Sequence, residues 1–169
     1  MTNEPQPDMT WSELNDTEGD AQITEMHQRF EALAGLDQAA REQQAESMIR
    51  AEYTIDDEPL ADFTEARLRS WMMMAGSNLS RAQDVANAYD KAFERVPGGM
   101  AMHHAALVQT VARDRFTPED MDVLYELIPR HVENVPRASQ EAVEHSIGTA
   151  RLTAGMVSAS GGKPWWKFW

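Results

Sequence analysis

The residues of this chain that could bind a metal ion or transfer a proton at neutral pH are its five histidines, His27, His103, His104, His131 and His145. On a helix, neighbours such as His103 and His104 point about 100° apart, so they do not readily share one ion. Glu141 and His145 have i, i+4 spacing, which is more typical of a surface contact than of a metal site. The chain has neither His-Glu-x-x-His nor the repeated Glu-x-x-His of di-iron bundles. We therefore expect no metal centre and no cofactor.

Motifs for nucleophilic catalysis or phosphate binding are missing from the sequence as well. There is no Gly-x-Ser-x-Gly, Gly-x-x-x-x-Gly-Lys or Gly-x-Gly-x-x-Gly, and the glycines of segment 97–99 follow a predicted helix, as in a turn. Pairs such as Glu119 and Asp122 are expected by chance among 28 acidic residues. The absence of cysteine excludes disulfides, thiolate metal sites and a cysteine nucleophile. We predict that the protein is not an enzyme; a deep polar pocket around His103 and His104 would favour an enzyme instead.

The sequence ends in an unusual concentration of aromatic and cationic side chains. Three of the five tryptophans lie in the last five residues, behind a Ser/Gly-rich stretch at 158–162. Tryptophan dominates binding hot spots, and a short motif on a flexible leash can anchor a whole domain to another protein. The predicted partner-binding residues are Lys163, Trp165, Trp166, Lys167, Phe168 and Trp169.

Two other interpretations of this ending stay open. Tryptophan and phenylalanine favour the depth of a membrane interface, and lysines assist on anionic lipid, so the segment could give weak membrane contact. Alternatively, the rings pack back onto the body of the same chain and cover a groove there.

A second apolar cluster, Trp71, Met72, Met73 and Met74, consists of four consecutive large side chains. These point around a whole helical turn, so one buried face does not hide them all. The cluster indicates either a central helix buried on most sides or an exposed methionine surface that adapts to partners. Trp11 either folds back on the body or forms a short docking motif. We assign these five residues to a predicted second partner surface.

The formal net charge is −13, and the arginines are scattered among acidic residues. A surface of this charge repels nucleic acid and anionic lipid, so we expect no direct nucleic-acid binding. An array of acids along one face that mimics nucleic acid remains an alternative. The start of the chain lacks the basic and apolar regions of a secretory signal, and no stretch approaches the ~20 apolar residues of a membrane span. We expect a cytoplasmic protein.

Apolar residues at three- and four-residue spacing predict helices over about 20–34, 38–53, 57–76, 78–96, 100–113, 118–128 and 137–157. Asp37, Asn78 or Ser77, and Thr117 are the expected N-caps, and Pro129 is expected to end or kink its helix. Alternating strand patterns and Asn-Gly or Asp-Gly hairpins do not occur.

The predicted organisation has three parts: a disordered acidic segment at 1–19, a helical domain at 20–157, and a flexible linker with an aromatic tail at 158–169. The predicted fold is all-α, a compact bundle of six or seven short-to-medium helices with flexible N- and C-terminal tails. The predicted function is a non-enzymatic adaptor or assembly factor that binds another protein or a multi-subunit complex through its tail. The alternatives are a peripheral membrane protein and an acidic nucleic-acid mimic that acts as an inhibitor. The sequence does not identify the partner, the oligomeric state or the helix topology.

Overall fold

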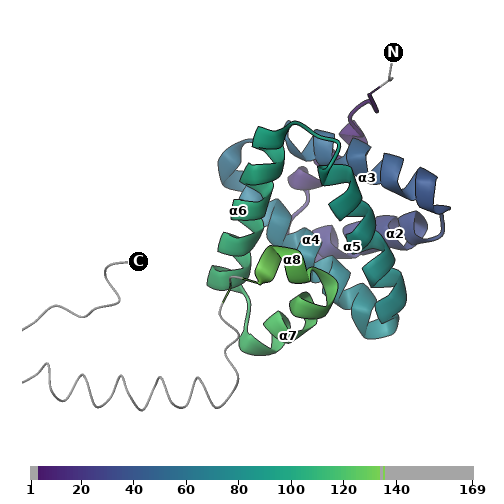
Figure 1. The fold of residues 1–169 in the computed structure, drawn as a ribbon. Helices are drawn as coiled ribbons and strands as arrows, with labels where there is room; N and C mark the ends of the chain where they lie inside the picture. The colour runs from purple at the N-terminus through teal and green to yellow at the C-terminus, as the bar shows by residue number, and fades with distance from the viewer. Residues whose placement is uncertain (1–3, 134, 136–169) are drawn as a thin grey trace, which may run out of the picture. The chain divides into compact units, whose positions relative to one another are not determined.

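Every regular element in the computed structural model is helical over the residues that it describes, which are 4–133 and 135. The elements are α1 (Met9–Ser12), η1, a 3-10 helix (Glu13–Asp16), α2 (Gly19–Ala34), α3 (Gln38–Glu52), α4 (Asp57–Ser77), α5 (Leu79–Phe93), α6 (Gly98–Arg115), α7 (Pro118–Leu127) and α8 (Pro129–Val132) (Figure 1). The predicted all-α bundle is therefore confirmed for this part of the chain.

Local capping chemistry sets the starts of three helices where the sequence predicts them. The carboxylate of Asp37 accepts from the backbone N–H of Ala40 at 2.9 Å, and the amide oxygen of Asn78 accepts from Arg81 N–H at 3.1 Å. Thr117 and Asp120 form a reciprocal capping box, in which each side chain accepts from the other residue's backbone N–H. These bonds satisfy donors that the first helical turn would otherwise leave open.

Pro129 separates α7 from α8, as the sequence predicts. Helix α7 ends at Leu127, and Pro129 occupies the first position of α8. Because proline lacks an N–H and fixes its own φ, it starts a helix more easily than it continues one. The chain therefore turns between α7 and α8, which contact each other.

The predicted disorder of residues 1–19 is wrong for residues 9–16, which form α1 and η1. Trp11 is fully buried, and its ring meets Phe30 and Phe63 edge-on at centroid distances of 5.1 and 5.4 Å. Leu14 is buried beside it. The acidic, proline-rich composition favoured disorder, but two apolar side chains with partners elsewhere in the fold outweigh it. The interpretation of Trp11 as a residue that folds back on the body is the one that the structure supports.

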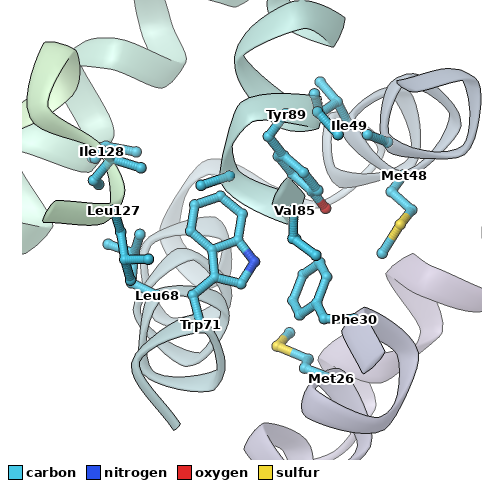
Figure 2. Close-up of a cluster of buried hydrophobic side chains, with 14 of the residues drawn as sticks. Met26, Phe30, Met48, Ile49, Leu68, Trp71, Val85, Tyr89, Leu127 and Ile128 are labelled. Carbon is cyan, nitrogen blue, oxygen red and sulfur yellow. The ribbon is translucent and has the colours of Figure 1, made fainter. Parts of the chain in front are cut away.

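Helix α4 lies at the centre of the packing, since it contacts α2, α5, α6 and α7. Figure 2 shows Trp71 of α4 between Leu127 and Ile128 on one side and Phe30 and Val85 on the other. The buried rings form one continuous series of contacts, all of them edge-on except for the tilted pair of Tyr89 and Phe93: Trp11, Phe30, Phe63, Trp71, Tyr89 and Phe93. Edge-to-face pairs of this kind add to the stabilisation from buried area. The predicted helix at 137–157 and the linker and tail at 158–169 lie outside the described residues.

Candidate functional site

A buried ion pair joins the end of α3 to the middle of α4. The guanidinium of Arg67 donates to the carboxylate of Glu52 at 2.6 Å, and both side chains are buried. Charged groups are rarely buried unless they are paired, because leaving water costs several kcal/mol per ion. The pair is therefore a specific feature of this core.

The Glu52 carboxylate also accepts hydrogen bonds from two other elements. The indole N–H of Trp11 donates to it at 3.0 Å, and the hydroxyl of Tyr89 donates at 3.3 Å. Burial, reinforced by the charge of Glu52, raises the pKa of Tyr89 well above its usual value, so this hydroxyl keeps its proton and remains a donor. Glu52 thus connects α1, α4 and α5.

On the other side of Arg67 lies a buried histidine. Nε2 of His104 in α6 is 3.5 Å from a guanidinium nitrogen of Arg67, and the imidazole stacks on Phe93 with centroids 3.7 Å apart. Burial is the largest cause that lowers the pKa of His104 well below its usual value, and the charge of Arg67 is the next. His104 is therefore neutral at pH 7, and its Nε2 lone pair faces the Arg67 donor.

The series ends in a contact between a histidine of α8 and a carboxylate of α5. Nε2 of His131 lies 2.5 Å from the carboxylate of Asp90, and the His131 ring approaches the His104 ring edge-on at 5.9 Å. We call the full set the buried polar series, in which all members except the half-buried His131 and Asp90 are inside the core: Trp11, Glu52, Tyr89, Arg67, His104, His131 and Asp90. It runs through the core from α1 to α8.

The space beside this series does not admit a substrate. The cavity that borders His104, His131 and Asp90 has a volume of about 10 Å³, room for about one water molecule. His103 points outward instead, where it contacts the hydroxyl of Tyr53 at 3.3 Å. The structure thus separates the two adjacent histidines, and the deep pocket that would favour an enzyme does not open around them. Over residues 4–133, no group of three or more histidine and acidic side chains is placed to hold a metal ion.

The outer face of α4 carries three adjoining hollows, which together we call the α4 groove. The first, about 410 Å³, has an acidic lining that includes Glu18, Asp62 and Glu65. The second, about 210 Å³, adds Met72 and Met73 to its wall, and the third, about 330 Å³, lies between α4 and α7. The first and second hollows share Ile23 and Arg69 as lining residues, and Met72 lines both the second and the third. The lining of the groove therefore becomes more apolar along the helix, with Asp122 and Glu126 as the acidic residues of the third hollow.

Part of the negative charge in the groove is already paired. Arg115 reaches across from α6 to Asp62 at 2.5 Å and to Glu65 at 2.9 Å. Arg69 donates to Glu65 at 2.9 Å while its guanidinium lies over the ring of Phe116. The acidic end is therefore a network of exposed ion pairs, which salt weakens.

The predicted second partner surface requires correction, because three of its five residues are inside the core. Trp11, Trp71 and Met74 are buried, so they cannot contact a partner in this fold. Helix α4 is enclosed on several sides, which leaves one narrow strip of it accessible. Met73, with 46% of its surface exposed, and the half-buried Met72 occupy that strip in the α4 groove.

The predicted partner-binding residues of the tail, Lys163, Trp165, Trp166, Lys167, Phe168 and Trp169, lie outside the described residues, and so do Glu141 and His145. Their roles stay predictions.

Sequence reasoning missed Arg67 and Glu52, although a signal for Arg67 exists. Five side chains of α4 recur at alternating steps of four and three, and all of them are buried: Leu60, Thr64, Arg67, Trp71 and Met74. A charged residue in such a stripe indicates a buried partner, although the sequence does not say which acid supplies it.

Comparisons with protein-family models, with curated proteins and with solved structures found no match for this chain. Among the helices of the described part, none is long and apolar enough to cross a membrane.

Proposed function

We propose that this protein is an adaptor that binds another protein through its C-terminal residues 163–169. The observation that carries the proposal is the distribution of the tryptophans. Trp11 and Trp71 are buried in the core of the helical body, whereas the other three stand together with two lysines at the end of the sequence. Tryptophan is strongly enriched in binding hot spots, and this favours a docking role for the cluster.

The α4 groove supplies a second contact for the same partner. Met73 and Leu79 line it and are both exposed, at 46% and 37%. Methionine side chains are flexible and polarisable, so they adapt to the shape of an apolar partner segment. The acidic end of the groove favours a partner whose contacting segment carries positive charge.

The test compares two variants of the full-length chain. In the ring variant, alanine replaces Trp165, Trp166, Phe168 and Trp169; in the matched lysine variant, glutamine replaces Lys163 and Lys167. We expect the ring variant to lose capture of the proteins that the wild type retains in an affinity pull-down, with unchanged helical content and melting temperature. The lysine variant should keep most of that capture, because rings rather than charges supply the anchor.

Two outcomes would overturn the proposal. If the ring variant retains the same proteins, the tail is not the binding element. If the ring variant melts several degrees lower, the rings serve the stability of the chain itself. Flotation with neutral and anionic vesicles distinguishes protein binding from the membrane alternative. If the tail binds membranes, the wild type should float with anionic vesicles and the lysine variant should not.

A further inference from the structure

The buried polar series contains one group whose charge the core does not match. His104 contacts side chains from three other helices, α4, α5 and α8, and each ionisable neighbour in them already has a partner of its own. Arg67 of α4 pairs with Glu52 of α3, and Asp90 of α5 pairs with His131 of α8. The remaining faces of the imidazole meet the Phe93 ring and the small closed cavity.

We propose that protonation of His104 releases the segment formed by α6, α7 and α8 from α4 and α5, which makes this part of the body an acid-sensitive element. The inference stands independently of the proposed function, since it concerns the helical body alone.

Geometry explains why a proton on His104 opposes this packing. A protonated imidazole no longer accepts from Arg67, so two cations would face each other with their nitrogens 3.5 Å apart. Among the titratable groups of the described residues around it, Tyr89 keeps its proton, and His103 on the same helix adds no negative charge. His131 faces the carboxylate of Asp90, and its charge is one of the lesser causes that lower the pKa of His104.

The position of His104 explains which part opens. Arg67 belongs to α4, and the repelled imidazole belongs to α6, so the repulsion acts across the contact between these two helices. Helix α8 has four residues and depends on neighbouring helices for its burial, as short elements do. The ring series that joins α1, α2, α4 and α5 does not include α6, so this part of the core keeps its contacts.

The direction of the pH dependence follows from proton linkage. The pKa of His104 is lowered in the folded chain, mainly by burial, relative to 6.5 when the residue is exposed. The opened segment therefore binds more protons than the closed one below this value. The closed segment has its full stability above about pH 6.5 and loses stability as the pH falls. The equilibrium constant for opening rises by up to about tenfold for each pH unit below that value.

Hydrogen exchange of the full-length chain between roughly pH 7.5 and 5.5 tests the proposal, once intrinsic exchange rates are corrected for pH. We expect protection of α6 and α8 to fall by up to about tenfold per unit below about pH 6.5 while α2 and α3 keep theirs. The His104→Gln variant should lose this pH dependence, and His103→Gln, which changes the exposed neighbour, should retain it.

Two results would overturn the proposal. One is an unchanged pH dependence in His104→Gln; the other is simultaneous loss of protection in all helices, which indicates ordinary acid unfolding. If His104→Gln does not fold, the imidazole resonances of the wild type give the same answer. A His104 that titrates near its ordinary value while α6 and α8 stay protected would contradict the mechanism.

Discussion

Arg67 and Glu52 form an ion pair inside the core, with 2.6 Å between guanidinium and carboxylate and side chains that are 0% and 1% exposed. Pairs of this kind add little net stability compared with apolar residues of similar volume, but breaking one is costly. Here the pair also organises its surroundings, because Trp11, Tyr89 and His104 all contact it. Through these three side chains the pair links α1, α5 and α6 to α3 and α4, the two helices that carry it.

Glu52→Gln should destabilise the chain by about 3–5 kcal/mol, because it leaves the Arg67 charge buried without a carboxylate. The amide oxygen still accepts from Trp11 or Tyr89, so the loss belongs mainly to the charge. Urea unfolding followed by circular dichroism measures the effect. The double variant Glu52→Gln/Arg67→Met removes the stranded charge and should recover part of the loss. Equal stability of single and double variants would show that the pairing carries no such penalty.

Trp11→Ala should lower the free energy of unfolding by about 3–5 kcal/mol, the range for removing a large buried ring. The substitution leaves a cavity between Phe30 and Phe63 and removes one donor from Glu52. Met9→Ala is the matched control, since Met9 lies in the same short helix with half of its surface exposed, and it should change stability by less than about 0.5 kcal/mol. Similar effects of the two substitutions in thermal melts would contradict the burial of Trp11.

Tyr53 should ionise late in an alkaline titration. Burial, together with the charge of Glu52, raises its pKa to about 12, and its hydroxyl donates to the carbonyl oxygen of Met100 at 2.8 Å. Because the folded-state pKa lies above the unfolded value of 10, the stabilising effect is complete below pH 10 and is lost as the pH rises through 12. Ultraviolet absorbance of phenolate should show a step near pH 12 that Tyr53→Phe removes. A step of the same size in this variant would assign the transition to another tyrosine.

Thr117→Ala should cost about 1 kcal/mol, because it removes the acceptor for the Asp120 backbone N–H at the start of α7. Thr110→Ala changes an exposed threonine of α6 and should be nearly neutral. Chemical denaturation of both variants checks the difference. Equal stability of Thr117→Ala and the wild type would mean that solvent replaces the cap without loss.

The elements that the sequence predicts correctly are those whose cause is local. Asp37, Asn78 and Thr117 cap helices through backbone groups three residues away, so their chemistry is visible in a short window. The burial of Trp11 is different, because its acceptor Glu52 lies 41 residues further along the chain. Composition around Trp11 favoured disorder, and only the folded partner reverses that preference.

The candidate site shows the same limit. The spacing of α4 places Arg67 on an apolar stripe, so its burial could have been predicted, but the choice of Glu52 among 28 acidic residues could not. Likewise, adjacent His103 and His104 point in directions about 100° apart on α6, so the ring of His104 is in the core and that of His103 is at the surface. Which of the two turns inward depends on the neighbours Phe93 and Arg67.

The long separation between Trp11 and its partners has a consequence for biosynthesis. Trp11 is translated 41 positions before Glu52, and at about 5–20 residues per second this separation takes roughly 2–8 s. The side chains of Leu127 and Ile128, which cover Trp71, arrive later still. The indole of Trp11 therefore waits several seconds in the nascent polypeptide for its native acceptor, and its ring partner Phe63 follows Glu52.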